Sequence, residues 1–175
     1  SRISPRPMWM AGHDDVNRTG SMALDMHIHD VDFIRYLMEA DPDRIQVQAL
    51  KDGAGIVQYI LSATYFYGDA ILNAEASWDY PVTFPFAETF RVRFEKAAVL
   101  LDASGKLTVY PEEGEAFEPQ IEEKEELDLG INISDIAPYR KEIRYFAERI
   151  LSGEKESMVS LTEAVKSLEL VKKEI

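Results

Sequence analysis

The sequence predicts an α+β fold in which an open, mostly antiparallel sheet of about six strands carries its helices on one face. Three observations support this prediction: helical periodicity at residues 20–40, β-type alternation through residues 45–127, and helical periodicity again from residue 139 onward. Short turn sequences join the strand candidates, and short connections favour antiparallel neighbours. The sequence shows no repeated alternation of strand and helix, so a parallel α/β sheet is not expected.

The first predicted element is a largely apolar helix from about residue 20 to residue 40. Residues 1–18 contain prolines, a glycine and a polar run, which is typical of irregular structure. Thr19 is a suitable N-cap for the helix. Asp41-Pro42 should end it, because the residue before a proline avoids the helical backbone conformation.

The strand candidates follow, and each is bounded by residues that favour turns. They cover residues 45–50, 56–67, 70–80, 88–94, 97–102, 106–110 and a weaker, acidic segment at 116–127. The glycine-containing segment 51–55 is typical of a hairpin connection, and Gly68-Asp69 and Ser104-Gly105 are typical of short turns. This order predicts strands that pair with their neighbours in sequence.

Two helices are predicted to close the chain. Apolar residues at positions 139, 143, 146, 147 and 150 have helical spacing, and Ser152-Gly153 should end that helix. Ser160-Leu-Thr-Glu163 is typical of a helix start, and a helix is expected from there to Ile175.

Composition narrows the classes of function. The 175 residues are 46% hydrophobic, which suits one domain with a sizeable core, and no apolar run approaches the roughly 18–20 residues needed to cross a bilayer. With no cysteine and no signal-peptide pattern, we expect a cytoplasmic protein without a membrane partner. The formal net charge of −13 argues against binding to nucleic acid. The acidic run at 112–128 is better interpreted as a solvated edge than as a docking surface for a basic partner.

A polar stripe on the first helix is the best candidate for chemistry. Asp25, His29 and Asp32 recur at i, i+4 and i+7, and Tyr36 continues the line, so about 3.6 residues per turn places all four on one face. Burying such groups is costly unless they bind one another or a ligand. A carboxylate one turn from a histidine can fix its tautomer and raise its basicity, which suits proton transfer.

Two other interpretations of the stripe are open on spacing alone. A histidine and a carboxylate on a helix can form a purely structural pair. The run Asp25-Met-His27-Ile-His29 also resembles the first strand of amidohydrolase-type metal hydrolases. Those sites need further histidines, and this sequence has none after His29 and no cysteine, so no metal site is predicted.

The same segment resembles a family signature. The residues Gly20-Ser-Met-Ala-Leu-Asp25-Met-His-Ile-His29-Asp-Val-Asp32 are similar to the pattern Gly-Gly-x-x-x-Asp-x-x-x-His-x-x-Asp of the glucose–fructose oxidoreductase and inositol dehydrogenase (Gfo/Idh/MocA) family, with a serine in place of the second glycine. Within the family, the sequence of this segment is most similar to the inositol dehydrogenase branch. Residues 139–153 and 160–164 are similar to the family's closing helices, so the resemblance covers nearly the whole chain.

The resemblance implies a domain with a partner domain. Residues 1–175 would be a single substrate-binding and oligomerisation domain of the dihydrodipicolinate-reductase-like C-terminal type. The family's N-terminal Rossmann domain, which binds NAD or NADP, is expected to be absent from this chain, since no Gly-x-Gly-x-x-Gly follows a strand. The implied function is oxidation of a sugar or polyol hydroxyl, with no activity for this chain alone. The alternative is a non-catalytic binding or interaction domain with the same fold.

The resemblance also implies roles for individual residues. His29 would be the general base on the substrate hydroxyl, and Asp25 would orient His29 or hold a neighbouring hydroxyl. Asp32 would line the same wall as a substrate contact, and His13 would contact substrate from the preceding loop. His27 points about 160° away from His29 on an ideal helix, so a solvent or packing role is expected for it.

Two further expectations concern packing. The strand faces that carry Phe90, Val92, Phe94, Tyr59, Leu61 and Ala63 cannot all be covered by three helices. We therefore expect one open, partly apolar sheet face that makes a homo-oligomer. The last helix, at residues 161–175, packs beside the nucleotide domain in relatives and is expected to be poorly anchored here.

Overall fold

The chain has the predicted α+β architecture. The structure is a computed structural model, and it describes residues 1–5, 21–51, 58–120, 137–155, 157–158 and 160–175. It falls into two compact units, Ser1–Glu118 with Thr162–Ile175 and Pro119–Leu161. The first unit contains the sheets and the helix that carries the polar stripe.

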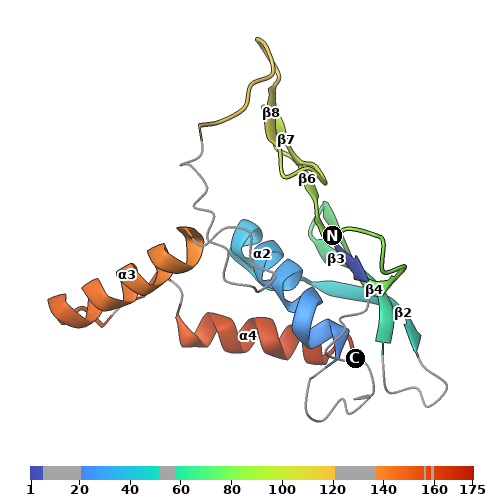
Figure 1. The fold of residues 1–175 in the computed structure, drawn as a ribbon, viewed down its shortest axis with the longest axis horizontal. Coiled ribbons are helices and arrows are strands. Elements are labelled where there is room, and N and C mark those ends of the chain that lie inside the picture. Colours follow the sequence, from blue (N-terminus) through green and yellow to red (C-terminus); the bar gives the residue numbers. More distant parts are fainter. Residues whose placement is uncertain (6–20, 52–57, 121–136, 156, 159) are drawn as a thin grey trace. The chain divides into compact units, whose positions relative to one another are not determined.

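The strands of the first unit form two sheets rather than the one that was expected (Figure 1). Five strands pair in the order β2-β3-β4-β1-β5, and all pairs are antiparallel except β1 with β4. Three more form a separate antiparallel sheet in the order β6-β7-β8. The bounds are Arg2–Pro5 (β1), Arg44–Lys51 (β2), Gln58–Tyr67 (β3), Ala70–Tyr80 (β4), Ala87–Glu88 (β5), Phe90–Arg93 (β6), Ala97–Leu101 (β7) and Leu107–Pro111 (β8).

Strand β1 corrects the expectation that residues 1–18 are irregular. It lies between β4 and β5 and runs parallel to β4, with Ile3 opposite Ser77. The register shifts between Ile3 and Pro5, where proline cannot donate a ladder hydrogen bond. A strand of four residues that ends in proline has too little alternation to be recognised, because its pairing depends on residues far away in the chain.

The predicted first helix is present, with one irregular turn. Residues Ala23–His27 form a π-helical turn, η2, which continues into α2 at Ile28–Met38. The helix ends earlier than Asp41-Pro42, because Glu39 takes the left-handed conformation with φ 53° and its backbone N–H donates to Arg35 O at 2.8 Å. The pattern of apolar residues did not indicate a π turn, since the same residues face the core either way.

The core lies between this helix, α4 (Leu161–Lys172) and one face of the five-stranded sheet. The small side chains on β3 and β4 let the helix approach the sheet closely. The fully or almost fully buried apolar residues are Met22, Ala23, Val31, Leu61, Ala63, Tyr65, Ala74, Ala76, Trp78, Leu170 and Val171. Both helices therefore cover a single face, as predicted.

The opposite face of this sheet is partly apolar, as expected, with Leu50 and Ile71 exposed at its two ends. Leu61 and Ala63 lie on the covered face, beneath the helix. Between Leu50 and Ile71 run two rows of polar cross-strand partners, Gln48–Ser62–Glu75 and Gln46–Thr64–Asn73. The Thr64 hydroxyl donates to Asn73 Oδ1 at 2.9 Å. Phe90, Val92 and Phe94 belong to the segment of the smaller sheet, and the side chain of Tyr59 lies outside the described residues.

The second unit contains α3, at Ala137–Ser152, which confirms the predicted helix and its end near Ser152-Gly153. No residue of α3 is buried, and Tyr139, Ile143, Phe146 and Ile150 are all exposed at helical spacing. Of the acidic segment predicted as a strand at 116–127, the structure describes residues 116–120. Within them, Phe117 forms an isolated antiparallel bridge with Val109. Among the described residues, no helix combines the length and the apolar character that crossing a membrane requires.

Candidate functional site

The polar stripe lies on the outward face of the helix formed by η2 and α2. Asp25, His29, Asp32 and Tyr36 are all exposed, so the spacing correctly placed them on one side. The opposite side of the same helix packs into the core through Met22, Ala23, Met26, His27, Val31, Ile34 and Arg35. The four stripe residues therefore form an accessible wall rather than a buried cluster.

Asp25 and His29 interact electrostatically across one turn. Burial raises the pKa of Asp25, and the positive form of His29 opposes that shift. Burial also lowers the pKa of His29, and Arg2 lowers it further, against the opposing carboxylates of Asp25, Asp30 and Asp32. The net lowering keeps the His29 imidazole neutral at neutral pH, so it can accept a proton.

Arg2 approaches the flank of the helix from strand β1. Its Nε lies 3.5 Å from Asp30 Oδ1, and its guanidinium also pairs with Glu88 on β5. Burial raises the pKa of Asp30, while the nearby positive charges oppose the shift. Arg2 could not be found from the sequence, because it reaches the site only through the unpredicted pairing of β1.

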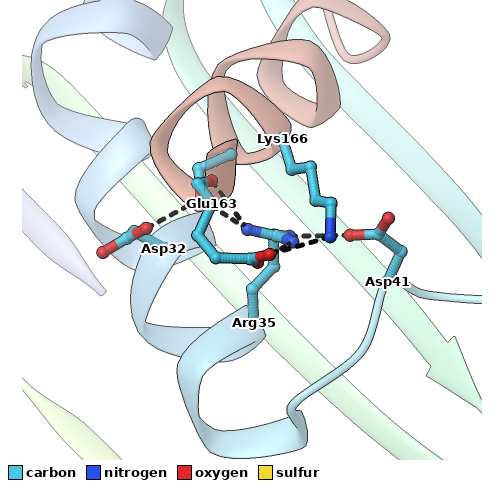
Figure 2. A network of polar contacts seen from close by, with 6 residues as sticks. Asp32, Arg35, Asp41, Glu163 and Lys166 are labelled. Atoms are coloured by element: carbon cyan, nitrogen blue, oxygen red, sulfur yellow. Dashed lines mark hydrogen bonds and ion pairs between the residues drawn. The ribbon is translucent and has the colours of Figure 1, made fainter. Parts of the chain in front are cut away.

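Asp32, expected to contact substrate, also contacts α4. The Ser167 hydroxyl donates to Asp32 Oδ1 at 2.7 Å and accepts from Arg35 Nη1 at 3.0 Å. Figure 2 shows Asp32 at one end of this polar network and Asp41 at the other. Asp32 thus faces outward while one of its oxygens is held by the last helix.

Arg35 is the centre of that network and was missed in the sequence. It is only 6% exposed, and it donates to Asp41 Oδ1 at 2.7 Å, to Glu163 O at 3.0 Å and to Glu163 Oε2 at 2.8 Å (Figure 2). Lys166 Nζ donates to Glu163 Oε1 at 2.8 Å. The sequence held one signal: Arg35 follows Val31 by four residues on the apolar face, where an arginine needs a partner.

The same contacts show that α4 is well anchored, contrary to expectation. Leu170 and Val171 lie in the core, and Arg35 bonds both the backbone and the side chain of Glu163. Hydrogen bonds from Lys166 and then Arg35 lower the pKa of Glu163, so the carboxylate stays ionised in the network.

His27 lies on the buried side, as its angle from His29 predicted. It is 0% exposed, and its Nε2 is 2.9 Å from Tyr65 Oη and 2.9 Å from Glu174 Oε2. Burial and then the charge and hydrogen bond of Glu174 raise the pKa of Tyr65. Of the solvent and packing roles that the sequence left open, the structure shows the packing role. Its two partners lie on β3 and beyond α4, and the sequence could not indicate them.

One predicted ligand contact falls on a residue that the structure does not describe. His13 lies outside the described residues, so its expected contact with substrate stays a prediction. In the described ranges, no three histidine or carboxylate side chains converge to hold a metal ion.

The described residues do not fit a dinucleotide. β1 and β4 are the only parallel pair among them, and the chain between these two strands includes β2 and β3 rather than a single crossover helix. A pyrophosphate site of the Rossmann type needs a glycine-rich turn between a strand and the helix that follows it. The described residues contain no such turn between a parallel strand and a crossover helix.

Comparison with known proteins agrees with this architecture. A family model described as the GFO/IDH/MocA C-terminal domain matches residues 4–100. A search of curated proteins found no match. A UDP-N-acetylglucosamine 3-dehydrogenase from Acidithiobacillus ferrooxidans is similar in structure, with a TM-score of 0.75 and 14% identity over 99% of this chain and 50% of its own.

Two other solved structures are similar over 98% of this chain, each with 18% identity. One is an oxidoreductase from Agrobacterium radiobacter in complex with NAD+, L-tartaric acid and magnesium, with a TM-score of 0.66 over 51% of its chain. The other is a proposed myo-inositol dehydrogenase from Sinorhizobium meliloti 1021, with a TM-score of 0.57 over 50% of its chain. At such identities the likeness concerns the fold, and this chain spans about half the length of these structures.

Proposed function

Because the chain belongs to the GFO/IDH/MocA C-terminal domain family, we propose that it is the substrate-binding and oligomerisation domain of an NAD(P)-dependent oxidoreductase. The proposed substrate class is a sugar or polyol, with oxidation at a hydroxyl. One observation carries the proposal: Asp25 and His29 are exposed together, one turn apart, on the outward face of the helix. Partial burial and Arg2 lower the pKa of His29, which favours its neutral form. A neutral histidine beside a carboxylate is suited to remove a hydroxyl proton.

The proposed chemistry divides between this chain and a nucleotide-binding domain. Oxidation of an alcohol removes a hydride from carbon and a proton from the hydroxyl, and NAD or NADP supplies the hydride acceptor when it is bound. His29 takes the proton, and Asp25 orients the ring or holds an adjacent hydroxyl. Asp32 bonds Ser167 through one oxygen, and a substrate hydroxyl is the proposed partner of the other. His13 is proposed as a further substrate contact.

The open face of the five-stranded sheet is the proposed surface for a homo-oligomer. Its rows of glutamine, serine, threonine and asparagine can exchange hydrogen bonds with the same rows of a second copy. Leu50 and Ile71, exposed at the two ends of these rows, would add the partly apolar contact expected from the sequence. A cytoplasmic location is proposed with it, on the absence of cysteine. Sedimentation that shows only monomer at high concentration would contradict the oligomer.

Turnover by the longer protein that includes a nucleotide-binding domain tests the function. A panel of sugars and polyols would be assayed with NAD and with NADP. We expect His29→Gln to lower kcat/KM by about 10²–10⁴-fold, because it removes the base. Tyr36→Phe, on the same exposed face, is the matched control and should stay near the parent value. Full activity in His29→Gln, or turnover by the 175-residue chain alone, would contradict the proposal.

The alternative is a non-catalytic binding domain that keeps the fold. The observation in its favour is the Ser167–Asp32 bond, which gives one stripe residue a structural partner. In that case the longer protein would bind a sugar or polyol, as measured by calorimetry, but would not reduce either nucleotide with any member of the panel.

A further inference from the structure

A second polar cluster lies directly beneath the proposed site, on the buried side of the same helical turn. His27 Nε2 is 2.9 Å from both Tyr65 Oη and Glu174 Oε2, and the side chains of His27 and Glu174 are fully buried. Tyr65 is also fully buried and hydrogen-bonds Glu174. The three residues come from η2, from β3 and from the segment beyond α4, so the cluster joins three parts of the first unit.

Polar atoms of the three side chains meet in one buried place. His27 Nε2 is hydrogen-bonded to Tyr65 Oη, and Glu174 Oε2 lies at the same 2.9 Å distance from Nε2. Polar contacts of this kind depend strongly on direction, whereas apolar contacts do not.

The helical turn above this cluster is π-helical. Such turns are rare and occur mostly as a single turn within an α-helix, frequently at functional sites. Among the other buried residues of η2, Ala23 has an apolar side chain, and Met26 Sδ accepts a long hydrogen bond of 3.6 Å from Ser4 Oγ on β1. His27 is the buried residue of the turn whose polar atoms contact both β3 and the segment beyond α4.

We propose that Tyr65 and Glu174 are positioning residues, which act through His27 to fix the rotation of the π-helical turn and so the placement of Asp25 and His29. Asp25 lies within the turn, and His29 follows it in the first residues of α2. The importance of that placement rests on the proposed function. The mechanical role itself concerns the structure of this chain and can be tested without turnover.

The test is an NMR titration of the His29 imidazole in the 175-residue chain and its variants. Glu174→Ala should move the His29 midpoint by about half a pH unit or more, because the distance to Asp25 changes. It should also shift the amide resonances of residues 23–29. Glu174→Gln keeps an oxygen acceptor for His27 and Tyr65, and should restore values close to the parent. The charges that act most strongly on His29 are Arg2, Asp25, Asp30 and Asp32, so the loss of the Glu174 charge is not the expected cause.

Two controls keep the result interpretable. Val171→Ala removes core volume at the residue whose carbonyl accepts from the Glu174 backbone N–H, and it changes no side chain of the cluster, so it should leave the His29 midpoint unchanged. If Glu174→Ala does not fold, Tyr65→Phe removes one hydroxyl from the cluster and is also expected to move the His29 midpoint. An unchanged midpoint in the folded variants, or an equal change in Val171→Ala, would overturn the proposal. Failure of the turnover assay would instead contradict the proposed function and leave this inference standing.

Discussion

The outward and inward faces of one helix carry polar residues of the same kinds in opposite settings. On the outward face, Asp25, His29 and Tyr36 are exposed. On the inward face, His27 and Arg35 are buried and bonded to residues more than thirty or one hundred positions away in the chain. The outward residues are accessible to a ligand, and the inward residues hold the helix in place.

This difference teaches how to interpret polar residues on an apolar helix. A buried histidine or arginine persists only where the fold supplies partners, so it reports on structure. An exposed set with shared spacing gains little stability from its position, so its pattern is better explained by binding or chemistry. Four experiments can break or sharpen this comparison.

The two histidines should give the largest contrast in stability. His27→Ala leaves the Glu174 carboxylate buried beside a cavity, and we expect it to lower the free energy of unfolding by about 3–5 kcal/mol. His29→Ala, two residues away, should change it by no more than about 0.5 kcal/mol, because the side chain is exposed. Urea denaturation followed by circular dichroism measures both. Equal losses would show that the two faces are not distinct.

The arginine and the neighbouring tyrosine give the second contrast. Arg35→Met keeps the apolar stem but removes the donors to Asp41, Glu163 and Ser167, so we expect a loss of about 2–3 kcal/mol. The expected loss of stability is smaller than for a fully buried ion pair, because the side chains of Asp41 and Glu163 are at least half exposed. Tyr36→Ala is the exposed control and should change the stability by about 0.5 kcal/mol or less. Urea denaturation measures both variants. A free energy of unfolding for Arg35→Met equal to that of the parent would contradict the role of Arg35 in anchoring α4.

The sequence was sufficient where the signal is local. Strands β2, β3 and β4 follow alternation over eight to eleven residues, and the exposed stripe follows the helical period. It was insufficient where partners are distant: β1 forms only against β4, and Arg35 and His27 acquire their roles from α4, β3 and Glu174. The division into two sheets was also beyond local patterns, because each strand is consistent with either arrangement.

The third experiment concerns Ser167, where the two faces meet. Ser167→Ala removes the bond to Asp32 and one of the bonds of Arg35, and we expect a loss of about 1 kcal/mol. If Asp32 contacts substrate, the same change in the longer enzyme should raise KM while kcat stays close to the parent value. Glu169→Ala, on the same helix but exposed, is the control. A loss of stability without any change in KM would favour a structural role for Asp32.

The smallest expected effect is the change of the free energy of unfolding with pH. A different group titrates on each side: His29 on the outward face and Glu163 in the network around Arg35. The pKa of His29 is lowered from its ordinary value of 6.5, so the unfolded chain binds that proton first as pH falls, and stability declines from about pH 6.5 downward. The pKa of Glu163 is lowered from 4.5, so its contribution is present above pH 4.5 and is lost as pH falls through its lower folded value.

Two variants show which group causes each decline of stability with falling pH. The urea unfolding midpoint is measured from about pH 8 to about pH 3. The decline at higher pH should disappear in His29→Gln, and the decline at lower pH should disappear in Glu163→Gln. In the longer enzyme, kcat/KM should fall on the acid side below pH 6.5, because protonated His29 cannot act as a base. Glu163→Gln should leave that acid limb in place, since Glu163 belongs to the anchor of α4. An acid limb that moves with Glu163→Gln would mean that the inward network sets the chemistry of the outward face directly, and the distinction between the two faces would fail.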